Sequence, residues 1–293
     1  MNQHDYCIRA TAANGAIRIF VATSRHMVER ARQIHLTTPV ASAALGRLLT
    51  GTSIMGLMLG NDDHSLTANI RGDGPIGSLL AVADGRGYVR GYAANPDIDL
   101  PLNEDGKLNV SGAIGQGNIT VMKDMGLKEP YIGNIELLNG EVAADIAYYY
   151  AQSEQTPSVV SLGVLVDLDH SIRQAGGYFI QLLPNASDSI IDKLETKVMK
   201  TPPITTMLEN GLTPEAILDN LVGEFGYEIM DSHPIEFRCN CSMQRAEGAL
   251  IAIGKKELND IIEEDKKAQI NCHFCNTSYD FDEEQLIKMA AAL

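Results

Sequence analysis

Residues 239–241 read Cys-Asn-Cys, and residues 272–275 read Cys-His-Phe-Cys. Two such close pairs can bring four thiolates around one tetrahedral metal ion, and an all-sulfur ligand set suits zinc far better than calcium or magnesium. The ligand count and spacing therefore predict one zinc ion held by Cys239, Cys241, Cys272 and Cys275. The same sulfurs can be oxidised to disulfides, so the site could act as a redox switch as well as stabilise the fold.

The spacing of the first pair leaves two roles open. A permanent structural zinc site with no redox role is the simpler interpretation. However, one residue separates Cys239 from Cys241, which is tighter than the roughly two to four residues of ordinary zinc fingers. A pair this close is also positioned to form a disulfide directly once the metal is lost.

Other interpretations of the second pair fit less well. A thioredoxin-like motif should open a helix, whereas Cys275 is followed by Asn276, Thr277 and a strand-like stretch. Haem attachment requires a histidine directly after the second cysteine, but His273 lies between the two. We expect His273 to be a surface residue or a neighbour of the ligands, since four sulfurs already complete a tetrahedron.

The segment around these cysteines should depend on metal for its stability. A module of about 60 residues buries too little apolar surface to be secure alone. Structural zinc contributes roughly 10–16 kcal/mol of apparent binding free energy at neutral pH, which exceeds the whole stability of such a module. We therefore expect metal binding to decide whether this segment is folded.

Composition and charge exclude several classes of protein. The chain has 293 residues, which indicates about two domains, and 45% of them are hydrophobic, so a packed core is expected. A net charge of −15 argues against broad binding to nucleic acid phosphates and against a polybasic membrane anchor. The first ten residues lack a basic stretch followed by an apolar core, so we expect no signal peptide.

The best candidate for a membrane span is the segment Pro39–Leu59. Arg47 interrupts it, and the uncharged run 48–61 is shorter than the ~18 residues that a span needs, so we expect a buried helix instead. Five cysteines without an export signal indicate a reducing compartment, and we expect a cytoplasmic protein. Cys7 lies alone in a strand-like pattern and is expected to be a small buried hydrophobe.

The N-terminal part predicts a mixture of strands and helices. Strand-like residues 6–12 and 16–22 flank Asn-Gly at 14–15, a strong signal for a two-residue hairpin turn. Ser24 is a suitable N-cap for a following helix, and Pro39 can occupy the first position of a second helix. The second helix is rich in Ala and Gly, as expected of a central helix that packs closely under a sheet.

The strands that follow do not alternate regularly with helices. Apolar segments and Gly-rich turns predict a β-meander over 66–94. Further elements are expected as strands at 118–123, 159–166 and 178–183 and as a helix near 141–153. This order favours an α+β class over a doubly wound sheet. We expect residues 1–183 to form a mixed core domain with an antiparallel-rich sheet and a buried central helix.

The composition changes after Pro184. Amphipathic helices are predicted over 187–200 and from Thr213-Pro214 onward, and alone they would be marginal. Residues 184–232 are therefore interpreted as a helical linker that needs a surface to lie on. If the linker lost that surface, a broad apolar face would be exposed, formed by Ile190, Leu194, Leu218, Leu221 and Phe225.

Residues 233–293 are interpreted as a small C-terminal zinc-binding domain. Ile235 and Phe237 alternate with polar residues, as in a strand that leads into the first cysteine pair. Two short helices broken near Gly254 should follow. Asp282 with Gln285 resembles a capping box for a final helix.

In its cysteine pairs and the helices that precede them, the chain resembles the 33-kDa heat-shock protein family of redox-regulated chaperones. The resemblance covers essentially the whole length. It rests on the two cysteine pairs, on Gly-Pro-Ile-Gly at 74–77, on PVASAALGR at 39–47 and on YAQSEQTPS at 150–158. Gly176-Gly177 before the last N-terminal strand also fits, and the ligand positions show no departure from the family pattern.

The resemblance implies a redox switch. Reduced protein would hold zinc through the four thiolates and be inactive. Peroxide or hypochlorite, aided by unfolding conditions, would pair Cys239 with Cys241 and Cys272 with Cys275 and release zinc. The C-terminal module would unfold, the linker would lose its docking, and the exposed apolar surface would hold unfolding client proteins without ATP. The family's active form is often a homodimer.

Two rival functions remain open. A thiol–disulfide oxidoreductase would show catalytic turnover, whereas a chaperone would hold clients stoichiometrically. A zinc-ribbon adaptor for nucleic acid would need salt-sensitive binding, although Asp and Glu outnumber Lys and Arg from His233 onward. We find no assignable set of nucleophile and base, so we do not expect an enzyme.

Overall fold

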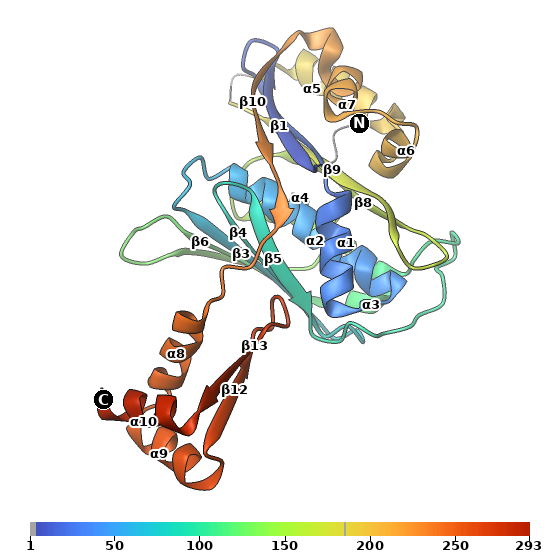
Figure 1. Ribbon diagram of the computed structural model, residues 1–293. Coiled ribbons are helices and arrows are strands. Elements are labelled where there is room, and N and C mark those ends of the chain that lie inside the picture. The colour runs from blue at the N-terminus through green and yellow to red at the C-terminus, as the bar shows by residue number, and fades with distance from the viewer. Residues whose placement is uncertain (1–3, 185) are drawn as a thin grey trace. The chain divides into compact units, whose positions relative to one another are not determined.

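The computed structural model describes residues 4–184 and 186–293 and contains two compact units (Figure 1). The first unit ends at Arg238, and the second comprises Cys239–Leu293. Strands and helices are mixed in both units, and nearly all strand pairs are antiparallel. The expected α+β class is confirmed.

A five-stranded antiparallel sheet contains both early and late segments of the first unit. Its order is β10-β1-β2-β9-β8, so β8 and β10 are the edge strands. The strands are β1 (Tyr6–Ala12), β2 (Ile17–Thr23), β8 (Ser158–Val166), β9 (Ile172–Leu182) and β10 (Tyr227–Pro234). Strand β10 was not predicted from the sequence; it follows the helical segment and pairs with β1.

A six-stranded sheet contains the predicted β-meander. Its order is β11-β5-β4-β3-β6-β7, and only the short pair β11–β5 is parallel. The strands are β3 (Ser65–Gly72), β4 (Ser78–Asp84), β5 (Tyr88–Ala93), β6 (Gly117–Asp124), β7 (Tyr131–Glu136) and β11 (Glu236–Phe237). The strand expected around Ile235 and Phe237 is therefore real but only two residues long.

Helix α2 (Pro39–Leu57) forms the centre of the first unit and contacts strands of both sheets. By length and composition it could cross a membrane, but 94% of its most apolar window is buried inside the structure. The expected buried central helix is confirmed. Its small residues allow close packing: a Cβ atom added at Gly56 would lie 2.5 Å from the carbonyl oxygen of Asp84 on β4.

Three further helices border this core, namely α1 (Arg25–His35), α3 (Val110–Ile114) and α4 (Ala143–Gln152). Two local predictions need correction here. Ala12 pairs with Ile17, so the first hairpin has a four-residue loop with positive φ at 13–15 instead of a two-residue turn. The hydroxyl of Ser24 does not cap α1, because it is hydrogen-bonded to Thr50 at 2.7 Å.

The buried carboxylate of Asp5 supplies the missing contact at the start of α1. Its Oδ2 accepts a hydrogen bond of 2.7 Å from the backbone N–H of Met27, and its Oδ1 lies 3.3 Å from Nδ1 of His26. Burial raises the pKa of Asp5, whereas the bonds from Met27 and His26 oppose that rise. A carboxylate from a distant strand end can thus do the work of a local cap.

The helical segment after the sheet strands has a surface to lie on. Helices α5 (Asp188–Lys200), α6 (Ile204–Glu209) and α7 (Pro214–Val222) and the 3-10 turn Gly223–Phe225 cover one face of the five-stranded sheet. They form an apolar cluster of their own, separate from the core around α2. Leu194, Leu218 and Leu221 are buried there, while Ile190 and Phe225 pack at its margin. The functional boundaries at 183/184 and 232/233 stay predictions.

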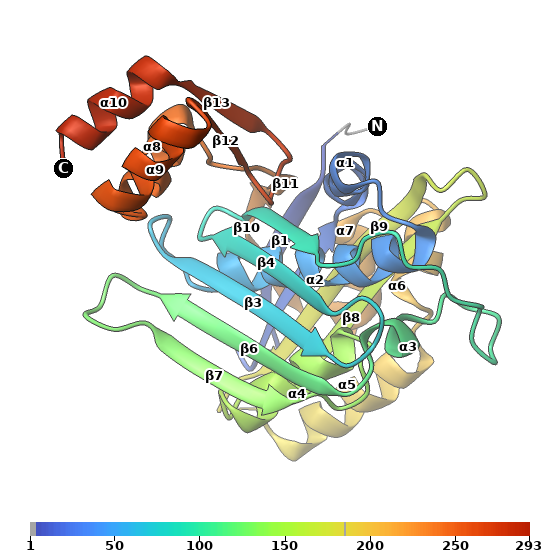
Figure 2. The same cartoon turned by 90° about the horizontal axis from the view of Figure 1, so that it is seen from below.

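The second unit is small. It contains α8 (Met243–Ala252), α9 (Lys255–Glu264), β12 (Lys267–Asn271), β13 (Ser278–Asp282) and α10 (Glu283–Ala291) (Figure 2). The two predicted helices meet at Gly254, and Asp282 and Gln285 form the predicted capping box on α10. Its core of buried hydrophobic residues comprises Ala246, Leu250, Leu258, Phe281, Leu286, Met289 and Ala290.

Truncation of Leu218 to alanine tests the packing of α7 on the sheet. Leu218 is fully buried, so L218A should lower the free energy of unfolding of the first unit by about 2–5 kcal/mol. Urea denaturation of the reduced protein measures this change. The control L168A alters a fully exposed leucine and should stay within about 0.5 kcal/mol of the parent chain. Equal effects of the two variants would contradict the packing described here.

Candidate metal centre

The four predicted ligands come from two segments of the second unit. Cys239 and Cys241 lie in the irregular stretch before α8, and Cys272 and Cys275 lie in the connection between β12 and β13. That connection is a tight turn, in which the N–H of Cys272 donates to the carbonyl of Thr277 at 2.9 Å. Asn276 adopts a left-handed conformation there, with φ of 55°. The turn holds the second pair rigidly at the end of a hairpin.

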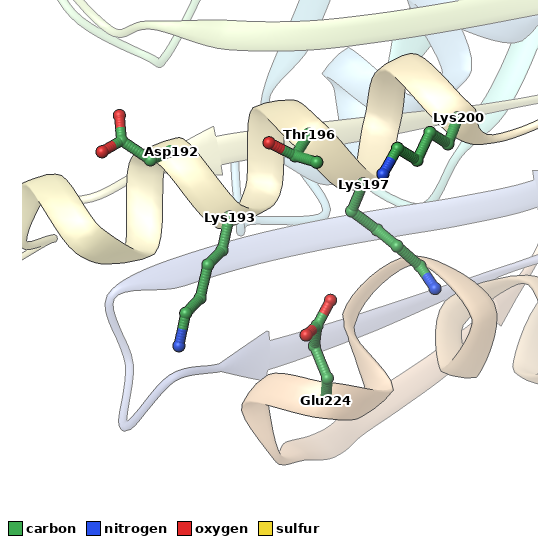
Figure 3. A pocket seen from close by; sticks show the side chains of 6 residues that line it. All are labelled: Asp192, Lys193, Thr196, Lys197, Lys200 and Glu224. Carbon is green, nitrogen blue, oxygen red and sulfur yellow. The ribbon is translucent and has the colours of Figure 1, made fainter.

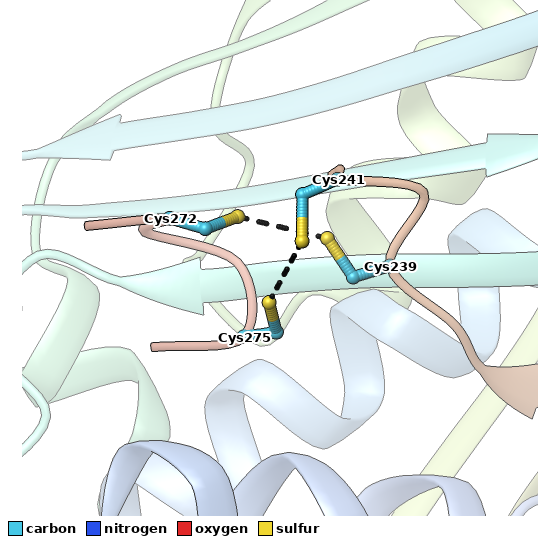
Figure 4. Close-up of side chains that lie close together, drawn as sticks. All are labelled: Cys239, Cys241, Cys272 and Cys275. Atoms are coloured by element: carbon cyan, nitrogen blue, oxygen red, sulfur yellow. Dashed lines mark hydrogen bonds between the residues drawn. The ribbon is translucent and has the colours of Figure 1, made fainter. Parts of the chain in front are cut away.

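The four sulfur atoms converge (Figure 4). All four Sγ atoms lie within 4.8 Å of one another; Cys239 is 3.6 Å from Cys272, and Cys241 is 3.3 Å from Cys275. Four thiolates bound to one zinc ion with Zn–S bonds of about 2.3 Å would stand about 3.8 Å apart. All four cysteines are free thiols. The cluster could therefore hold a metal ion, and its size fits a tetrahedral sulfur site.

Two side chains that sequence reasoning did not single out touch the sulfurs. The hydroxyl of Tyr279 donates a hydrogen bond of 3.1 Å to Sγ of Cys241, and this bond raises the pKa of Tyr279 to about 12. The hydroxyl of Thr277 lies 3.2 Å from Sγ of Cys275. Thr277 lies two residues after Cys275, and Tyr279 lies on β13, four residues after it. This closeness to a predicted ligand is the sequence signal that could have found them.

The acidity of the thiols differs within the cluster. Burial by itself raises the pKa of Cys275, but hydrogen bonds from Thr277 and contacts with the neighbouring thiols outweigh burial and lower it to about 7. Burial raises the pKa of Cys239 and also that of Cys241. Metal ligation requires deprotonated sulfurs, so a bound cation would have to stabilise the thiolate form of all four.

The structure also places the other cysteine and histidine residues that the sequence analysis considered. His273 is exposed and does not belong to the four-sulfur cluster. Cys7 is buried on β1 among apolar side chains, and burial raises its pKa, as expected of an inert thiol. Cys275 is followed by a turn and then by β13, whereas a thioredoxin-like motif would open a helix.

A charged hollow on α5 does not compete with this cluster. It measures about 320 Å³ and is lined by Asp192, Lys193, Thr196, Lys197, Lys200 and Glu224 (Figure 3). Most of these side chains are exposed, and none of them is buried. Solvated charged side chains of α5 and of the 3-10 turn explain the hollow.

Comparison with known proteins agrees with this geometry. A model of the family described as Hsp33 protein matches residues 5–282. A protein of Lachnoclostridium phytofermentans named 33 kDa chaperonin is 50% identical over 283 residues, which cover 97% of each chain. A protein of the same name from Clostridioides difficile is 51% identical over 286 residues, which cover 97% of this chain and 98% of the relative.

The fold has a solved counterpart. The crystal structure of the 33 kDa chaperonin of Thermotoga maritima superposes with a TM-score of 0.91 at 36% identity and covers 99% of each chain. Fold and sequence together define a chaperone. The chain belongs to the Hsp33 family.

Removal of metal under reducing conditions should unfold the second unit alone. We expect this because a metal ion bound by the four cysteines would cross-link the two pairs and add to a core of few buried hydrophobic residues. After treatment with a strong chelator, hydrogen exchange should show loss of amide protection throughout 239–293, while β1, β2 and β9 stay protected. Retained protection in α8 and α10 of the metal-free protein would contradict a stabilising role for the cluster.

Proposed function

We propose that this protein is a redox-regulated, ATP-independent holdase chaperone of the cytoplasm. In the reduced form, Cys239, Cys241, Cys272 and Cys275 hold one zinc ion and the protein is inactive. Oxidation pairs the four sulfurs into two disulfides, unfolds the second unit and exposes apolar surface that holds unfolding proteins. The convergence of four free thiols in a unit with little core of its own carries this proposal.

The choice of zinc rests on the donor set. Four sulfurs without a carboxylate or imidazole among them suit zinc and exclude calcium and magnesium. Zinc bound there would cross-link the segment before α8 to the β12–β13 turn and supply most of the stability of the unit. Tyr279 and Thr277 would orient the sulfurs through their hydrogen bonds.

The oxidation step balances with peroxide as the oxidant. Each pair of thiolates loses two electrons and forms one S–S bond. One peroxide molecule takes up these electrons and two protons from solvent, and its O–O bond breaks to give two molecules of water. The zinc ion leaves as Zn²⁺. Two peroxide molecules therefore oxidise the whole cluster. Sulfurs in disulfides are no longer thiolates, so no ligand set remains.

We propose the pairs Cys239–Cys241 and Cys272–Cys275. In the folded unit the short sulfur distances instead join Cys239 to Cys272 and Cys241 to Cys275. However, one and two intervening residues separate the proposed partners, so their encounter costs little loop entropy even in an unfolded segment. The proposed pairs would therefore persist after the unit has lost its structure, and they would not hold its two ends together.

Strands β11 and β10 are the part of the chain that connects the second unit to the helices over the apolar cluster. Cys239 follows Arg238, whose N–H donates to the carbonyl of Val89 on β5 at 2.8 Å. Strand β10 is mostly exposed, with Ile229 and Met230 open to solvent, so few apolar contacts hold it on β1. Loosening of this segment would release α7 and the helices before it from the sheet. The apolar cluster beneath them would then be open to clients.

Several features of the active form follow as part of the proposal. A net charge of −15 would keep a protein with exposed apolar surface in solution. Holding would be stoichiometric and would need no nucleotide, and the oxidised form would associate into homodimers. Unfolding client proteins are the partners, and neither nucleic acid nor a membrane is needed for their capture.

Oxidation of the purified protein with peroxide at elevated temperature tests this function. Zinc release, formation of the two disulfides and suppression of client aggregation should rise together. The variant C7S should behave as the parent chain, since Cys7 is buried in the first unit, whereas C272S should lose zinc and be active without oxidant. Full activity in the reduced, zinc-loaded parent would refute the switch. Catalytic turnover in insulin reduction would favour a thiol–disulfide oxidoreductase.

A matched pair of substitutions in α8 tests whether unfolding of the second unit controls activation. Gly248 is exposed, has no atom within 4 Å of an added Cβ and lies beside the exposed Ala249. G248A should stabilise the helix by about 0.5–1 kcal/mol and A249G should destabilise it by a similar amount.

At equal oxidant dose, G248A should leave about two- to fivefold less of the unit unfolded, and A249G about two- to fivefold more. Chaperone activation should follow the same order, although neither residue touches a cysteine or a client. Aggregation assays taken at intervals after oxidation measure this. Identical activation of the two variants would show that unfolding of the second unit does not control chaperone activity.

A further inference from the structure

Strand β8 (Ser158–Val166) is an edge strand without the protection that edges usually carry. It reads SVVSLGVLV, with no charged residue and no proline in nine residues. The other edges of the two large sheets each contain an acidic residue, namely Glu228 of β10, Glu136 of β7 and Glu236 of β11. An uncharged edge of this length is a ready template for pairing with another extended chain.

A groove of about 660 Å³ runs along this edge. Its lining includes every residue of 161–168. Because successive side chains of a strand point to opposite faces, an unbroken run of lining residues means that the groove lies against the backbone edge itself. Every second residue of an edge strand directs its N–H and C=O groups away from the sheet. Backbone hydrogen-bonding groups of β8 therefore face the groove.

The walls of the groove stand on either side of β8. Pro39, Ala43 and Arg47 of α2 and the loop 102–108 form one wall, and residues 203–206 at the start of α6 form the other. Exposed leucines lie at the rim, with Leu168 fully exposed and Leu102 58% exposed. The lining is thus largely apolar, and its charged groups are Arg47 and Lys107 against Asp167.

Arg47 of the α2 wall is already held in place. Its Nη1 donates a hydrogen bond of 2.6 Å to the carboxylate of Glu141, and the side chain is mostly shielded from solvent. The wall on the α2 side is therefore fixed by an ion pair.

Helix α6 limits access to the edge in the reduced form. A Cβ atom added at Gly163 would lie 2.6 Å from Cγ2 of Thr205 and 2.9 Å from Cγ2 of Ile204, so α6 rests directly on the middle of β8 (Figure 1). Arg173 binds Asp167 in the turn after β8 and Glu209 at the end of α6. Release of α6, which the proposed function requires, would therefore open the middle of β8.

We propose that this groove captures an extended, uncharged segment of an unfolding client protein, which adds to the sheet as a strand beside β8. Backbone hydrogen bonds then provide affinity for any sequence, and the apolar side chains of β8 select β-prone segments over charged ones. The proposal rests on the proposed function and assigns the client-binding contacts to 161–166. A second copy of this chain is the alternative occupant, and its binding would appear as a change in dimer content in the test below.

A labelled nonapeptide of alternating valine and threonine is the probe, with an analogue methylated at every peptide nitrogen as its control. The oxidised full-length chain should bind the peptide at least about tenfold more tightly than the analogue, because methylation removes the donors needed for strand pairing but keeps the apolar surface. Hydrogen exchange of the unmodified chain should slow at amides within 161–165 when the peptide is bound. Equal affinity for both peptides, or protection confined to α5–α7, would overturn the proposal.

The variant L165K places a charge on the edge, on the same strand face as Gly163, and L127K is the matched control at an exposed loop leucine of the other sheet. L165K should bind the peptide about tenfold more weakly and L127K should be unchanged, because an edge lysine opposes strand addition. Unchanged binding by L165K, or an altered dimer content with unchanged binding, would contradict client capture at β8. If the oxidised parent chain fails to hold any client, the proposed function falls; if it holds clients while β8 shows no protection, only this inference falls.

Discussion

The meeting of four sulfurs is the contact on which the second unit depends. It joins the segment before α8 to a β-hairpin more than thirty residues away, in a unit whose buried hydrophobic cluster is small. A metal ion bound there would supply more free energy than such a core can provide. In the proposed function, removal of the sulfur ligands would therefore act on the fold of the whole unit and not only on a local site.

The first unit is organised differently, because it contains two large apolar clusters of its own. Two sheets share the buried helix α2, and the five-stranded sheet has a second apolar cluster on its other face under α5, α6 and α7. These two clusters have different tasks in the proposed switch. The cluster around α2 would keep the unit folded, while the cluster under the helices is the surface that would become available.

Strand β8 links the switch to recognition. Natural sheets protect their edges with charge, proline or short length, and β8 has none of these. Helix α6 rests on its middle instead, at Gly163, so the protection comes from an element that the proposed oxidation would displace. In this arrangement the feature that makes an edge prone to aggregation becomes the means of holding another protein that would otherwise aggregate.

The sequence by itself determined the features that depend on short-range chemistry. The sulfur spacing, the proline start of α2, the capping box of α10 and the alternation in the meander all predicted what the structure contains. Tertiary structure alone decided which hydroxyl or carboxylate caps α1, that residues 227–234 pair with β1, and that β8 is an edge. Pairing partners lie more than two hundred residues apart in β1 and β10, and no local pattern of polarity specifies which strand a segment will meet.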